Sequence, residues 1–138
     1  MLNQLKDVFS SFQKHEVRYL VIGGIAAVLH GVPRATFDLA ILIEATPENA
    51  QRLLDALLAA QLGTAALTST DEILSHEITI FKDRVRIDVQ TTTPGITFES
   101  AKVNSSQYSS RWRTFVIRGN MVAPLLKRFN LLCRLVIF

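Results

Sequence analysis

Along the first half of the chain, the apolar residues alternate between the spacing typical of helices and the short apolar runs typical of strands. Strands are predicted at 18–22 and 36–44, separated by a Gly-Gly turn and a short helix of small residues at 23–30. An amphipathic first helix, running through about His15, precedes them and is indicated by apolar residues at helical spacing: Leu2, Leu5, Val8, Phe9 and Phe12.

A second long helix is predicted to begin at Thr46-Pro47-Glu48. Threonine is a good N-cap, proline is favoured at the first helical position, and an acidic residue suits the first turn. We expect this helix to end near Gly63. Its predicted buried stripe consists of Ala50, Leu53, Leu54, Leu57 and Leu58.

The second half of the chain predicts a mixture of short elements. Residues 64–75 are poorly patterned, with a short helix at 70–75 as an option. The remaining predictions are a hairpin of Glu77–Phe81 and Val85–Gln90, a helix over Phe98–Val103, a loop containing Ser105, Ser106, Ser109 and Ser110, a strand over Arg113–Ile117, and a terminal helix over Leu125–Leu135. This order predicts an α/β (α+β) fold, with helices on a small mixed sheet.

Length and composition favour an ordinary globular chain. The 138 residues predict a single domain spanning 1–138, and 49% of them are apolar while 20% are charged. The net charge of +3 permits an anionic ligand without requiring one. Cys133 is the only cysteine, which excludes an intramolecular disulfide and a cysteine-based zinc site. The sequence has neither a signal peptide nor an apolar run of about 20 residues, so a cytoplasmic protein without membrane contact is the default expectation.

Candidate chemistry centres on the second strand. Asp38 is expected to be a mid-strand, buried carboxylate, and burying a charge requires a partner or a metal. Residue 40 lies on the same face of the strand but is an alanine. Two carboxylates at 38 and 40 would suit two divalent cations about 3.5–4 Å apart, as used for in-line phosphoryl displacement. The chain instead presents one carboxylate and one methyl group.

Residues 19–45 resemble the minimal nucleotidyltransferase superfamily, especially its branch of AbiEii-type toxins and related stand-alone proteins. That branch has an apolar strand, Gly-Gly or Gly-Ser, a helix, and then Arg-x-Thr-x-Asp-φ-Asp-φ, where φ is apolar. Five residues match in order and spacing: Gly23, Gly24, Arg34, Thr36 and Asp38. A third acid on a later strand is matched by Asp88 in VRIDVQT, so the resemblance covers roughly residues 17–98. Ala40 departs from the pattern.

The resemblance implies metal-dependent transfer of a nucleotidyl group from an NTP to a hydroxyl acceptor, which could belong to RNA or to a protein. Asp38 and Asp88 would ligate Mg²⁺, and Asp88 would also assist the attacking hydroxyl. Gly23 and Gly24 would let backbone N–H groups approach the triphosphate. Arg34 would offset phosphate charge, and Thr36 completes the nucleotide-binding motif.

Structural roles stand beside each of these functional ones. Arg34 or Arg86 could neutralise Asp38 in a salt bridge, and Arg86 could do the same for Asp88. The glycines could form a plain tight turn, and Thr36 is at home in a strand as a β-branched residue. Ala40 leaves three interpretations: a weakened or lost enzyme, a non-catalytic nucleotide- or protein-binding module such as a toxin–antitoxin component, or an active sequence with an altered residue 40.

The carboxyl end, LLCRLVIF, consists mainly of apolar residues. Members of the resembled family usually continue with a further helical segment. One expectation is therefore a truncated or frame-altered version of a longer protein. The other is a last helix that docks into the core.

Overall fold

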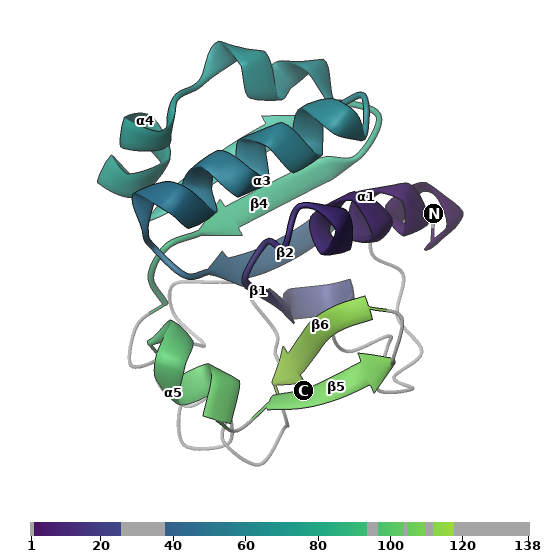
Figure 1. Cartoon of the computed structure of the whole chain (residues 1–138), viewed down its shortest axis with the longest axis vertical. Coiled ribbons are helices and arrows are strands. Elements are labelled where there is room, and N and C mark those ends of the chain that lie inside the picture. Colours follow the sequence, from purple (N-terminus) through teal and green to yellow (C-terminus); the bar gives the residue numbers. More distant parts are fainter. Residues whose placement is uncertain (1, 26–37, 94–96, 104, 110–111, 118–138) are drawn as a thin grey trace.

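A six-stranded mixed sheet is the centre of the computed structural model, which describes residues 2–25, 38–93, 97–103, 105–109 and 112–117 (Figure 1). The strands are β1 (Tyr19–Ile22), β2 (Asp38–Ile43), β3 (Ile78–Lys82), β4 (Arg86–Gln90), β5 (Ser105–Ser109) and β6 (Trp112–Ile117). The helices are α1 (Leu2–Lys14), α3 (Pro47–Ala59), α4 (Thr70–Ser75) and α5 (Phe98–Val103), with a 3₁₀ turn η1 (Gly63–Leu67). The predicted α+β class, a mixed sheet with flanking helices, is confirmed.

The sheet order is β3-β4-β2-β1-β6-β5. β2 lies between β1, to which it is antiparallel, and β4, to which it is parallel. The predicted β3–β4 hairpin forms one side, and a second antiparallel pair, β5–β6, joins β1 through parallel pairing with β6. The two candidate acidic residues are therefore on neighbouring strands, although 50 residues of sequence separate them.

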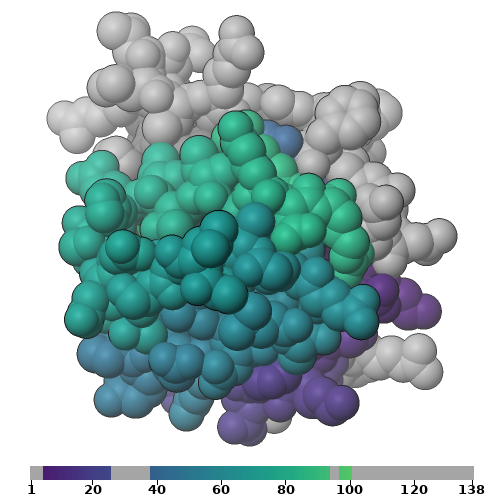
Figure 2. All heavy atoms as spheres, turned by 90° about the horizontal axis from the view of Figure 1, so that it is seen from above, coloured from purple at the N-terminus to yellow at the C-terminus, as the bar shows by residue number. Residues whose placement is uncertain are grey.

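One face of the sheet is covered by α1 and α3, which pack against each other (Figure 1). Within the predicted apolar stripe of α1, Leu5, Val8, Phe9 and Phe12 are buried. Phe9 and Phe12 both contact Tyr19 of β1, with ring centroids 6.3 and 4.9 Å from the Tyr19 ring. Large side chains buried in this way contribute roughly 1.5–3 kcal/mol each. The strand side chains in this core are Tyr19, Val21, Leu39, Ile41, Ile43, Phe81, Ile87 and Val89. Seen from above the view of Figure 1, the segment from α3 to β4 forms one continuous surface beside α1 (Figure 2).

The start of α3 agrees with the sequence. Thr46 accepts a hydrogen bond from the Asn49 backbone N–H, and Pro47 occupies the first turn. The Asn49 side chain is buried and fixes this helix to the sheet. It accepts from the Arg18 N–H at 2.8 Å and donates to the carbonyls of Arg18 and Glu44 at 2.9 and 2.8 Å. These hydrogen bonds join the start of α3 to the carboxyl-terminal end of β2, which is the end of the strand far from Asp38.

The predicted end of α3 was wrong by four residues. The helix ends at Ala59. Gln61, rather than Gly63, adopts the left-handed conformation after the helix, with φ of 61°. Leu58 was also predicted to be buried and is 44% exposed, because it lies at the side of the stripe that faces away from the sheet.

The predicted serine loop after α5 was wrong as well. Ser105–Ser109 forms β5, an edge strand paired antiparallel with β6 and interrupted by an irregularity between Gln107 and Ser109. Serine lacks strand propensity, but backbone hydrogen bonding to an apolar neighbour strand can outweigh that weak preference. Ser110 lies outside the described residues.

Other predictions from the second half of the chain fare better. The optional helix at 70–75 is α4, and it begins with a capping box in which Ser69 and Glu72 bond each other's backbone N–H groups. The predicted α5 and the strand ending at Ile117 also form. The predicted helix at 125–135 lies outside the described residues. Within the described part of the chain, none of the helices has the length and apolarity to cross a bilayer.

Candidate functional site

Asp38, Ala40 and Asp88 share one face of the sheet. Asp38 pairs with Arg86, and Ala40 pairs with Asp88, in the parallel register of β2 and β4. Directly paired residues project to the same side, as do residues i and i+2 of one strand. This is the face opposite the α1–α3 layer, because Leu39 and Ile87, which alternate with the site residues, belong to the helix-covered core.

The Arg86 guanidinium links the two carboxylates. Its Nε donates to Asp88 Oδ1 at 2.8 Å and its Nη2 donates to Asp88 Oδ2 at 3.2 Å, a bidentate pair. The same Nε lies 3.9 Å from Asp38 Oδ2. Hydrogen bonds to Asp88, then its charge, and more weakly the charge of Asp38, raise the pKa of Arg86 above its usual value. Asp38 and Asp88 therefore already share one positive charge, that of the Arg86 side chain.

Burial of Asp38 was predicted from its apolar neighbours and is wrong. Its side chain is 48% exposed, whereas the Asp88 side chain is 19% exposed. Asp38 is the first residue of β2, at the end of the strand where its side chain reaches solvent, whereas Ala40, two residues further along the same face, is buried. The need to compensate a buried charge therefore does not explain Asp38, and its presence has to be explained by what it contacts.

Gly23 and Gly24 lie at the same end of the sheet as Asp38. Ile22, the last residue of β1, pairs with Ala40, so the glycines follow β1 at the level where Asp38 begins β2. Gly23 has φ of 72°, in the region that favours glycine, and residues 23–25 already have helical character. The end of β1 and the first residues of the helix predicted at 23–30 are therefore described, and residues 26–30 lie outside the described residues. Arg34 and Thr36 lie outside the described residues.

Lys82 is a neighbour of this site that the sequence motif did not indicate. It pairs with Arg86 across the β3–β4 hairpin, so Lys82, Arg86 and Asp38 form one row across three strands. Lys82 is exposed. The hairpin was predicted with Lys82 in its turn, between Phe81 and Val85. In the structure β3 extends to Lys82 and β4 begins at Arg86, so Lys82 is a strand residue paired with Arg86.

The carboxylates fit one divalent cation better than two. Mg²⁺ is commonly held by one or two carboxylates together with substrate phosphates and water. Asp38 and Asp88 can supply that, but Ala40 offers no oxygen between them. Among the described residues, no group of three or more acidic, histidine or cysteine side chains gathers at any point. A two-cation arrangement is therefore not supported by this set of side chains.

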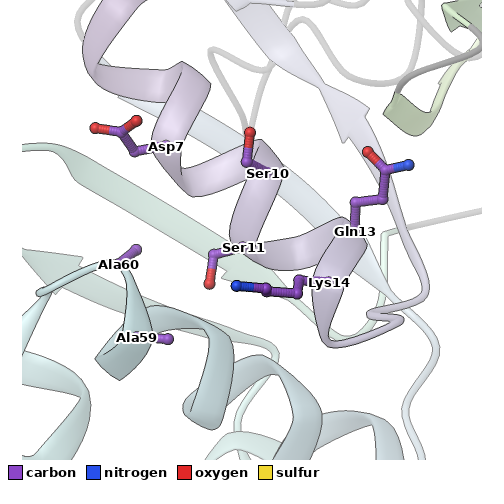
Figure 3. Close-up of a pocket in the computed structure, with 7 residues that line it drawn as sticks. All are labelled: Asp7, Ser10, Ser11, Gln13, Lys14, Ala59 and Ala60. Carbon is purple, nitrogen blue, oxygen red and sulfur yellow. The ribbon is translucent and has the colours of Figure 1, made fainter.

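A pocket on the other side of the sheet lies between α1 and the end of α3 (Figure 3). The side chains of Ser11 and Lys14 point toward the end of α3, and the Ser11 hydroxyl donates to the Ala56 carbonyl at 2.6 Å. Asp7 is the one carboxylate among the lining residues. This pocket does not bring acidic groups together, so it is a poorer candidate for metal-assisted chemistry than the Asp38–Asp88 face.

Comparisons with protein-family models, with curated proteins and with solved structures find no match to this chain.

Proposed function

We propose that this protein is a nucleotidyltransferase-type protein whose site binds an NTP with one Mg²⁺ and transfers the nucleotidyl group slowly or not at all. The single observation that carries the proposal is the placement of Asp38 and Asp88 on one face of adjacent strands, in contact with the same guanidinium. The resemblance of residues 19–45 to the minimal nucleotidyltransferases supports the same reading.

Each residue has a defined task in this proposal. Asp38 and Asp88 hold the Mg²⁺, which supplies charge neutralisation to the phosphates when bound. Gly23 and Gly24 leave room for the triphosphate at the start of the helix, and Arg34 and Thr36 complete the nucleotide-binding motif. Asp88 would also assist the attacking hydroxyl, and pyrophosphate would leave from the NTP as the nucleotidyl group is transferred. The acceptor is an RNA or protein hydroxyl.

Ala40 accounts for the weakness of the proposed activity. An aspartate here would stand beside Asp38 on the strand and opposite Asp88, in the position to bridge two cations. A methyl group contributes neither charge nor a ligand. With one carboxylate already paired to Arg86, the face carries little net negative charge for a second cation.

The experiment compares the wild-type protein with Ala40→Asp. Binding of ATP and the other NTPs is measured by calorimetry, and transfer of labelled nucleotide to RNA and protein acceptors is followed with and without Mg²⁺. We expect weak, Mg²⁺-dependent NTP binding by wild type and a gain in transfer only for Ala40→Asp. Ala40→Asn is the matched control, because it adds a side chain of similar size without the charge.

Two results would contradict the proposal. Absence of NTP binding by wild type and Ala40→Asp would remove the nucleotide altogether. Measurable transfer at equal rates by both forms would show that Asp38 and Asp88 suffice and that the site is not weakened.

The second candidate is a non-catalytic protein-binding module, such as one component of a toxin–antitoxin pair. The Arg86–Asp88 pair favours it, since the bidentate contact satisfies the less exposed acid without any metal. This candidate predicts a folded protein that ignores Mg²⁺ and NTPs. The binding measurements above distinguish it from the first.

A further inference from the structure

We propose that Arg86 is an exchangeable counter-ion of the site: its guanidinium holds Asp38 and Asp88 together when no divalent cation is present, and it must leave them before they can bind one. The inference rests on the proposed function in one respect, that a divalent cation is the ligand of these two acids. It concerns a positioning residue that acts through the carboxylates.

The Arg86 guanidinium lies where a cation bound by Asp38 and Asp88 would have to lie. Both Asp88 oxygens are occupied by its Nε and Nη2, and the Asp38 carboxylate faces the same Nε. A cation that used Asp88 in two-point fashion would have to replace both hydrogen bonds. Since guanidinium and metal carry like charges, the two also repel when both are close.

The surroundings allow the exchange. The Arg86 side chain is 40% exposed, so its guanidinium can move toward solvent without unpacking the core. Lys82 lies beside Arg86 in the same cross-strand row. A released guanidinium would therefore remain next to a second cation, on the face where a triphosphate is proposed to bind.

The test measures Mn²⁺ binding to the full chain without nucleotide, by electron paramagnetic resonance and calorimetry, for wild type and Arg86→Gln. Removing a charge that close should tighten Mn²⁺ binding by about tenfold at low ionic strength. The matched control is Arg18→Gln, which deletes the same charge and also breaks an ion pair, the 3.0 Å contact with Glu44 at the opposite end of β2. We expect no change in Mn²⁺ affinity for that control.

Arg86→Lys is the second variant, and it tests the counter-ion role of Arg86 if Arg86→Gln does not fold. It keeps the charge but cannot form the bidentate contact, so its Mn²⁺ affinity should lie between those of wild type and Arg86→Gln. Divalent cations should also raise the melting temperature of the Arg86 variants more than that of wild type. A structural role alone would lower stability without any gain in Mn²⁺ affinity.

Several outcomes overturn the inference: unchanged or weaker Mn²⁺ binding by Arg86→Gln, an equal gain in Arg18→Gln, or, where Arg86→Lys alone folds, no gain in that variant. Failure of the proposed function is a separate result. If Arg86→Gln gains Mn²⁺ affinity and no form binds or transfers a nucleotide, the counter-ion role stands and the nucleotidyltransferase assignment falls.

Discussion

The methyl group of Ala40 lies opposite the carboxylate of Asp88 in the parallel register of β2 and β4. The carboxylate of Asp38 lies on the same face of β2, two residues before Ala40. Asp38, Ala40 and Asp88 therefore lie together on the face opposite the α1–α3 layer, and Arg86 contacts both acids. The contacts of Arg86 are unequal, which leads to the first prediction.

Asp88→Asn should destabilise the protein more than Asp38→Asn. Asp88 makes two charge-assisted hydrogen bonds to Arg86, whereas Asp38 is 3.9 Å from it and half-exposed. We expect a fall in melting temperature of roughly 3 °C for Asp88→Asn and less than about 1 °C for Asp38→Asn, measured without divalent ions. Equal shifts would mean that the guanidinium is shared evenly between the two acids in solution.

Asn49→Ala tests the connection between α3 and the sheet. The substitution leaves the Arg18 N–H and the carbonyls of Arg18 and Glu44 without their partner, at a side chain that is 1% exposed. The free energy of unfolding should fall by about 2–4 kcal/mol in urea denaturation. Gln51→Ala, on the exposed side of the same helix, is the control and should change it by no more than about 0.5 kcal/mol.

The capping box of α4 predicts a contribution to stability that depends on pH. Hydrogen bonds from Thr68 and the Ser69 N–H lower the pKa of Glu72 below its usual 4.5. Because the folded pKa is the lower one, this contribution is complete above the unfolded pKa and disappears as the pH falls through the folded value. Melting temperatures across roughly pH 3–6 should therefore converge for wild type and Glu72→Gln at the acid end. Glu77→Gln, outside the box, should follow wild type throughout.

Gly24→Val tests the role of the Gly-Gly turn. Gly24 is partly exposed, whereas Gly23 is buried with positive φ, so position 24 can accept a side chain with less backbone strain. A branched side chain here should abolish NTP binding in calorimetry while circular dichroism shows a folded protein. Unchanged NTP affinity in a folded variant would leave the turn with a purely structural role.

Local patterns predicted much of this fold and part of its site. The α1 stripe, the Thr46 cap and the β3–β4 hairpin depend on residues close in sequence, and all three form as expected. The strand β5 and the exposure of Asp38 depend on which strands become neighbours and where the sheet meets solvent, and both predictions were wrong. The salt bridges of Arg86 with Asp38 and with Asp88 were predicted as structural alternatives, and both form. That one guanidinium contacts both acids at once follows from the β2–β4 register, which joins segments about 50 residues apart and is not readable from either strand alone.

Ala40→Asp should make the stability of the protein depend on divalent cations. The new carboxylate would be opposite Asp88 and beside Asp38, at a position that is 7% exposed, with Arg86 as the nearby cation. Without metal the crowded carboxylates repel and one of them resists ionisation, so the melting temperature should fall by roughly 3–6 °C at neutral pH. Mg²⁺ at millimolar concentration should reverse most of that loss, because a bound cation offsets the repulsion. Ala40→Asn should lose less stability and gain nothing from Mg²⁺, since it adds a similar volume without charge. Differential scanning calorimetry of the three proteins, with EDTA and with Mg²⁺, separates these effects. An Ala40→Asp variant that is equally stable in both conditions would show that the three positions do not form a common cation site.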